Sequence, residues 1–349
     1  MTTPLGDDQA SRIPPRPPLP KRSDGASPAP RTGDNLQAQW QARKAEFDTH
    51  VSHARDQIDL ANERIKERTG RDLVLAILVG LLIGAVIIGS LVFAKWSFVL
   101  IGLAIVLLAV WELVLALRAG GRRVDLWPQL VVGAALAAAG YFADPWLCWV
   151  MLFVAVFVVV IWRLLGQMLA RDGRTYGDVL TDVFAGGFVQ VYVPFLGALT
   201  LLLLRQPRGE WWVLAFIIVV VVADTAAYAS GLLFGRGGRH PMAPRISPKK
   251  TWEGFAGAVV ASLAAGALIG VFMLEIPWWA GVIFGAALVV SATLGDLGES
   301  LLKRDLGIKD MSSWLPGHGG LLDRLDSILP SAVVALALFH LLTPLAAAA

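Results

Sequence analysis

Residues 73–94 read LVLAILVGLLIGAVIIGSLVFA and contain no ionisable side chain. A helix over this stretch is long enough to cross a hydrocarbon core of about 30 Å, because an α-helix rises about 1.5 Å per residue. Eight further apolar stretches follow, at residues 98–117, 126–143, 146–165, 183–204, 211–234, 255–274, 278–294 and 321–342. The sequence therefore predicts an all-α, polytopic integral membrane protein with about nine transmembrane helices.

The composition supports the same fold class. Of the 349 residues, 56% are hydrophobic and 16% are charged, and the mean hydropathy is +0.63. An average soluble protein has about 25% charged residues, so an ordinary soluble enzyme is excluded. The net charge of +3 fits the Lys/Arg bias of cytoplasmic loops and gives no indication of a nucleic-acid partner.

The chain before the first apolar stretch has two parts. Residues 1–35 are rich in Pro, Ser, Gly and Arg, and this composition predicts a disordered tail. Residues 36–71 have apolar side chains at steps of three, four or seven, which predicts an amphipathic cytoplasmic helix. This helix either rests on the membrane surface or on its own domain, or it forms a short coiled coil between two chains. Residues 72–349 form the predicted transmembrane domain.

Basic residues concentrate in alternate loops between the apolar stretches, and such loops are typically cytoplasmic. The opposite loops contain only Lys95, Arg205 and Arg208. This pattern predicts a multi-pass protein of the cell membrane, with the N-terminus in the cytoplasm and the C-terminus outside. The unusual polar clusters of the second half then all lie at the cytoplasmic face.

The first of these clusters surrounds Asp224, in the sequence DTAAYASG at 224–231. An ionisable group within a membrane span costs about 2.5–3.5 kcal/mol on insertion scales, so Asp224 marks a site or pairs with a neighbouring helix. The loop at 234–254 combines glycines with five cations, including Lys249 and Lys250. Such a loop suits phosphate groups, but it is also compatible with an ordinary cytoplasmic loop, and it lacks the Walker spacing.

A third cluster, at residues 295–327, contains three further carboxylates. Asp323 and Asp326 are three residues apart and would share one face of a helix, while Asp296 ends the preceding span. These carboxylates would repel one another unless a cation lies between them, and Mg²⁺ prefers hard oxygen ligands that leave room for substrate phosphates. The surrounding basic residues are Lys303, Arg304, Lys309 and Arg324. Glu299, four residues before Lys303, is explained by a helical ion pair. His318 is either a phosphate donor or a loop residue.

The third cluster also carries a specific family resemblance. The sequence SLLKRDLGIKDMSSWLPGHGGLLDRLD at 300–326 resembles the C-terminal signature of the phosphatidate cytidylyltransferases, or CDP-diacylglycerol synthases. DTAAYASG at 224–231 and SPKKTWEG at 247–254 resemble the same family in the same order. The resemblance covers about residues 72–343 in architecture, with its motifs between 224 and 327, and does not include the preceding tail.

The resemblance implies a reaction of phospholipid biosynthesis, in which CTP and phosphatidic acid give CDP-diacylglycerol and pyrophosphate. It implies an all-helical membrane homodimer with a metal held by Asp296 and Asp323, and with Asp326 and Asp224 as further ligands or supporting residues. Mg²⁺ is the expected metal, and K⁺ shares the centre in the family. The residues expected to contact phosphates are Lys249, Lys250, Lys303, Arg304, Lys309, His318 and Arg324.

Two alternatives remain open on the sequence alone. A related CTP-dependent enzyme would use another lipid acceptor, such as a polyprenol or an ether lipid, and apolar helices do not reveal the acceptor. A transporter would use Asp224 as an ion site. A transporter should show paired repeats or polar residues near the span centres, whereas the polar groups here cluster at one face.

Overall fold

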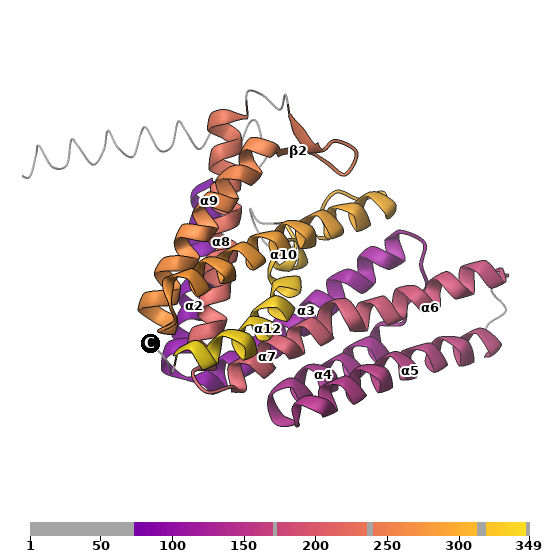
Figure 1. Ribbon diagram of the computed structural model, residues 1–349. Coiled ribbons are helices and arrows are strands. Elements are labelled where there is room, and N and C mark those ends of the chain that lie inside the picture. Colours follow the sequence, from indigo (N-terminus) through magenta and orange to yellow (C-terminus); the bar gives the residue numbers. More distant parts are fainter. Residues whose placement is uncertain (1–72, 170–172, 236–239, 313–318, 347–349) are drawn as a thin grey trace, which may run out of the picture. The chain divides into compact units, whose positions relative to one another are not determined.

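The computed structural model describes residues 73–169, 173–235, 240–312 and 319–346. The predicted disordered tail (1–35), the predicted amphipathic helix (36–71) and His318 lie outside the described residues. The helices are α2 (Leu73–Phe93), α3 (Lys95–Ala119), α4 (Leu126–Phe142), α5 (Pro145–Leu169), α6 (Tyr176–Gln190), α7 (Leu196–Arg205), α8 (Gly209–Phe234), α9 (Trp252–Ile269), α10 (Trp278–Asp305), α11 (Leu322–Leu325) and α12 (Ile328–Ala346) (Figure 1). Two π-helical turns are η1 (Val191–Phe195), between α6 and α7, and η2 (Gly270–Leu274), after α9.

The helices correspond to the nine predicted apolar stretches. In the described part of the chain, seven helical segments are long and apolar enough to cross a membrane, and two shorter apolar helices are Gly80–Phe93 and Leu126–Phe142. The prediction of an all-α, multi-pass membrane protein is confirmed.

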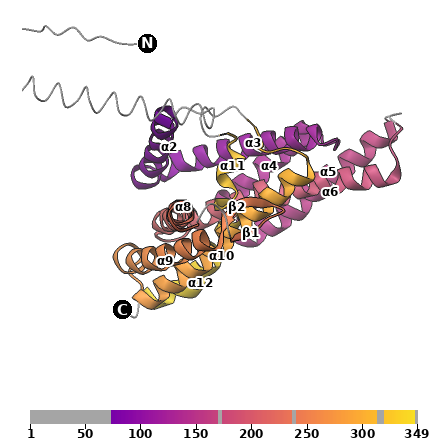
Figure 2. The same cartoon turned by 90° about the horizontal axis from the view of Figure 1, so that it is seen from above.

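One predicted span begins earlier than its apolar stretch. Tyr176–Arg205 is a single membrane-length segment that contains the predicted stretch 183–204. A capping box starts it, because Thr175 accepts a hydrogen bond from the Asp178 amide and Asp178 accepts one from the Thr175 amide. Figures 1 and 2 show α6 beside α5.

Helices α8, α9 and α10 pack closely because small residues line their contacts. A Cβ at Gly266 of α9 would overlap the carbonyl of Gly281 on α10, and one at Gly285 would overlap the carbonyl of Ser262. Within a membrane, such small residues let helix backbones approach and gain van der Waals contact. Asp224 lies in α8, Asp296 lies in α10, and Lys249 and Lys250 directly precede α9, so the packing of these three helices fixes the relative positions of the polar clusters.

The segment between α8 and α9 contains an antiparallel hairpin where the sequence predicts a loop. Its strands are β1 (Pro241–Ala243) and β2 (Ser247–Thr251), with Pro241 opposite Thr251 and Ala243 opposite Ser247 (Figure 1). Thr251 also caps α9, since its hydroxyl accepts a hydrogen bond from the Gly254 amide at 3.2 Å. The hairpin thereby holds the basic residues of β2 at the start of α9.

Candidate active site

A cavity of about 560 Å³ opens between α8, β2, α9, α10 and α11. The structure brings together in its wall the four carboxylates that the sequence singles out, and these are Asp224, Asp296, Asp323 and Asp326. The carboxylates reach the cavity from three separate parts of the chain. The clusters of the second half of the sequence therefore form one site.

The predicted phosphate contacts divide into two groups. Lys249, Lys250 and Arg324 line the cavity with the carboxylates. Lys303, Arg304 and Lys309 do not line it, and the Arg304 Nε instead donates to the Ile246 carbonyl at 3.2 Å. The hairpin and α11 therefore supply the cations of the cavity wall. Lys303 of α10 does not line the cavity but contacts Asp323, which does.

Lys250 on β2 neutralises Asp296 on α10. The Lys250 Nζ lies 2.5 Å from the Asp296 Oδ2, and both side chains are less than one third exposed. The Ser300 hydroxyl donates to the other carboxylate oxygen of Asp296 at 3.4 Å. This ion pair fastens the hairpin to α10 across the cavity.

Asp323 organises the start of α11. Its carboxylate lies 3.0 Å from the Lys303 Nζ and accepts hydrogen bonds from the amides of Gly320, at 2.9 Å, and Met311, at 3.1 Å. Lys303 also contacts Glu299 at 3.1 Å, so the predicted helical ion pair is confirmed. These contacts hold the Asp323 carboxylate in place in the cavity wall.

A residue that the sequence analysis did not single out supports the same segment. Glu112 of α3 is fully buried, and its carboxylate accepts hydrogen bonds from the Ser312 hydroxyl at 2.5 Å and from the amides of Leu321, at 2.9 Å, and Leu322, at 2.7 Å. It thus binds the chain on which Asp323 and Asp326 lie. The available signal was a lone carboxylate inside an apolar stretch, the same signal that identified Asp224.

Comparison with known proteins identifies the family. A family model described as the cytidylyltransferase family matches residues 74–342. The chain belongs to the cytidylyltransferase family. A phosphatidate cytidylyltransferase of Mycobacterium bovis is 42% identical over 281 residues, covering 77% of this chain and 88% of the relative. One from Mycobacterium leprae is 40% identical over 291 residues, covering 79% and 90%, and one from Brucella suis is 36% identical over 166 residues, covering 47% and 57%. The predicted resemblance is confirmed, and the protein is a nucleotidyltransferase.

The donor chemistry of this cytidylyltransferase fits a hard cation. Asp224, Asp296 and Asp326 line the same cavity and repel one another electrostatically. Carboxylate oxygens facing an open cavity are the ligands that Mg²⁺ prefers, and a divalent ion would offset the repulsion. Within the described ranges, no three Asp, Glu, His or Cys side chains already stand close enough together to hold a metal ion. The Mg²⁺ site therefore stays a prediction.

A glycine sets the distance between two walls of the cavity. A Cβ at Gly295 would overlap the Asp326 carbonyl and lie 2.8 Å from the Pro330 Cγ. We expect Gly295→Ala to lower the cytidylyltransferase rate by about tenfold or more, because displacement of about 1 Å at a reacting centre is costly. Gly298→Ala on the same helix is the matched control, because a Cβ there meets nothing within 4 Å. Equal initial rates for the two folded variants would contradict this account of Gly295.

Proposed function

We propose that this cytidylyltransferase transfers the cytidylyl group of CTP to phosphatidate, giving CDP-diacylglycerol and pyrophosphate in phospholipid biosynthesis. The observation that carries the proposal is the cavity itself, which gathers carboxylates, two lysines and an arginine at one end of membrane-length helices. The names of the relatives support phosphatidate as the acceptor.

The reaction joins two polyanions. An oxygen of the phosphatidate phosphate attacks the α-phosphorus of CTP, a new P–O bond forms, and the bond to the β-phosphate oxygen breaks to release pyrophosphate. The main obstacle is charge repulsion, so catalysis rests on positioning and electrostatic stabilisation. Lys249, Lys250 and Arg324 would contact the phosphates, with Arg324 suited to bidentate contact. A separate general base is unnecessary, because phosphatidate is already ionised near neutral pH.

The proposed metal is Mg²⁺, which when bound supplies positive charge to the phosphates and the leaving pyrophosphate. Asp296 and Asp323 would hold it, with Asp326 and Asp224 as further ligands or supporting residues, because all four carboxylates line the cavity. Asp323 would also hold Lys303 and the amides that precede α11. A K⁺ ion at the same centre is a prediction from the family resemblance.

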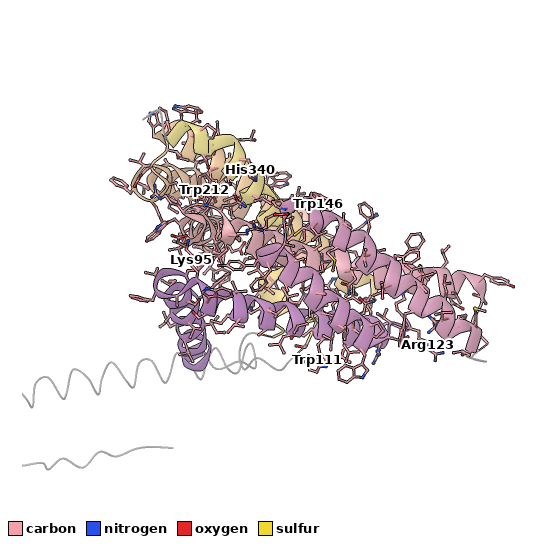
Figure 3. The ribbon with its side chains drawn as sticks, turned by 90° about the horizontal axis from the view of Figure 1, so that it is seen from below. Lys95, Trp111, Arg123, Trp146, Trp212 and His340 are labelled. Carbon is pink, nitrogen blue, oxygen red and sulfur yellow. The ribbon has the colours of Figure 1, made fainter. Side chains whose placement is uncertain are left out.

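We propose the cytoplasmic face of the cell membrane as the place of reaction, with the N-terminus inside, the C-terminus outside and a homodimeric assembly. The Lys/Arg distribution of the sequence supports this orientation. Figure 3 shows Arg123, from one of the basic loops, at the end of α3 opposite Lys95. The C-terminal end of α10, which carries Asp296, lies at the Arg123 end of α3, since Arg122 is 3.7 Å from Asp305.

An acceptor panel tests this function. Purified protein in detergent, with CTP and Mg²⁺, is given phosphatidate, an ether-linked phosphatidate or a polyprenol, and the lipid products are identified by mass spectrometry. We expect CDP-diacylglycerol and pyrophosphate with phosphatidate at the highest rate. CDP released with the polyprenol alone would contradict the acceptor assignment, because it indicates phosphoryl transfer to an alcohol. Ion flux in vesicles without any CTP turnover would favour the transporter alternative.

A further inference from the structure

A second cavity, of about 340 Å³, lies at the C-terminal end of α3 and shares no lining residue with the catalytic cavity. We call it the arginine cavity, because its wall contains four arginines and a single carboxylate. These charged residues are Arg118, Arg122, Arg123, Arg174 and Asp125. Neither the reaction nor the family motifs between 224 and 327 account for it.

A buried carboxylate holds the wall of the arginine cavity in place. Asp182 of α6 is 1% exposed, and it accepts hydrogen bonds from the Arg163 Nη2 at 2.8 Å, the Arg174 Nη1 at 2.9 Å and the Arg123 amide at 2.7 Å. The Arg174 Nη2 also donates to the Gly121 carbonyl at 2.9 Å. Because both terminal nitrogens of Arg174 are fixed, its guanidinium is oriented before any ligand binds, which lowers the entropic cost of binding.

A tight turn after α3 brings the other arginines to the same place. Gly121 has a φ of +83°, a conformation that favours glycine, and the Arg122 amide donates to the Leu117 carbonyl at 2.9 Å. The Arg118 Nε donates to the Val124 carbonyl at 2.7 Å, so this side chain bridges the end of α3 and the chain after the turn. The chain is therefore folded so that successive arginines face one cavity.

The charge of the arginine cavity selects an anion. Four arginines and one carboxylate, Asp125, line the cavity, and the other acidic residues near these arginines are Asp178, Asp182 and the largely exposed Asp305. The tendency of cytoplasmic loops to be basic explains arginines at this end of the helices. It does not explain their convergence on one cavity around a buried Asp182. Guanidinium groups match phosphate oxygens through paired, charge-assisted hydrogen bonds, so a phosphate group is the ligand of best fit.

The position of the cavity favours a lipid as the source of that phosphate. Trp127, two residues after Asp125, is 75% exposed, and Trp162, one residue before Arg163, is 52% exposed. Exposed tryptophans near the ends of membrane helices lie at the level of the lipid headgroups. Trp162 lines a small cavity that shares Arg123 and Asp125 with the arginine cavity, and Figure 3 labels Arg123 at the end of α3.

We propose that the arginine cavity binds the phosphate of an anionic phospholipid headgroup, at a site separate from the catalytic cavity. The bound lipid is held by Arg118, Arg122, Arg123 and Arg174, of which Asp182 positions Arg174 and the Arg123 backbone. The site does not depend on which acceptor the enzyme uses, so it stands or falls independently of the proposed reaction.

Lipid binding to the purified full-length protein tests this proposal. Native mass spectrometry or a fluorescence titration would measure binding of phosphatidylglycerol, which is a phosphodiester and not the proposed substrate, and of phosphatidylcholine as the zwitterionic comparison. We expect Arg118→Gln/Arg122→Gln to weaken phosphatidylglycerol binding by about tenfold or more, since charge-assisted hydrogen bonds are lost. The matched control is Arg205→Gln/Arg208→Gln at the other end of the helices, where the arginines pair with Asp144 and Glu275.

Each outcome decides the proposal. Unchanged affinity in folded Arg118→Gln/Arg122→Gln protein, or an equal loss in the control, would overturn it. Full competition by inorganic phosphate at the lipid concentration would show a free-phosphate site and overturn the lipid assignment. If the double variant does not fold, Arg122→Gln alone serves instead. Among the described residues, the Arg122 side chain forms one ion pair, a 3.7 Å contact with the exposed Asp305, so its loss should cost little stability. A severalfold weaker affinity is then expected, and wild-type affinity would contradict the proposal.

Discussion

Asp323→Asn is expected to lower the rate of cytidylyl transfer by about 100-fold or more. The carboxylate of Asp323 holds the Lys303 ammonium and two backbone amides at once. An asparagine offers one acceptor oxygen and turns an NH₂ group toward groups that are themselves donors. Losses of this size are typical when a preorganised electrostatic contact of an active site is removed. The measurement is the initial rate of labelled CDP-lipid formation from CTP and phosphatidate by purified protein.

The matched control for this substitution is Asp144→Asn. Asp144 is 72% exposed and lies 3.9 Å from Arg205, away from the catalytic cavity, so a change within about twofold is expected. If folded Asp323→Asn protein retained more than half of the wild-type rate, the role assigned to Asp323 would be wrong.

Glu112→Gln is expected to produce the second-largest loss, of about tenfold or more. At a fully buried position the wild-type carboxylate accepts hydrogen bonds from Ser312, Leu321 and Leu322, and a glutamine leaves part of them unmade. A buried donor without a partner costs about 1–3 kcal/mol, and here the cost falls on the segment that carries Asp323. The loss should appear mainly in kcat, with a small change in KM for CTP, because Glu112 does not line the catalytic cavity.

Glu210→Gln is the control for the second prediction. Glu210 is likewise a helical glutamate, but it is only partly buried and pairs with Lys95 at the other end of the bundle. We expect wild-type kcat for this variant, even if its melting temperature falls slightly. A wild-type kcat for Glu112→Gln, measured on protein that melts normally, would show that Glu112 does not position the catalytic segment.

The helices were predictable from the sequence, because a long apolar segment within a membrane must hydrogen-bond its own backbone, and a helix does this within the segment. Their ends were less predictable. The predicted span 278–294 continues as α10 to Asp305. The additional turns are polar, and the Glu299–Lys303 ion pair stabilises them. The hairpin before α9 was missed because its strands are short and contain polar residues.

The carboxylates of the site were predictable because each stands out in or beside an apolar stretch. Which cations face them was not predictable, since that depends on side-chain direction. Lys303 turns to Asp323 behind the cavity, whereas Lys250 reaches Asp296 from the hairpin. The support from Glu112 was not predictable either, because it joins residues separated by 200 positions in the chain.

The most direct test of the central claim is to follow both products of one reaction. Purified wild-type protein and Asp323→Asn are incubated side by side with phosphatidate, Mg²⁺ and CTP labelled at the α-phosphate. Labelled lipid and free pyrophosphate are then quantified together. The account predicts equal amounts of CDP-diacylglycerol and pyrophosphate from the wild type, dependent on phosphatidate, and almost none from the variant. The account would be contradicted if folded wild-type protein placed no label in lipid. It would also be contradicted if Asp323→Asn formed as much labelled lipid as an active wild type.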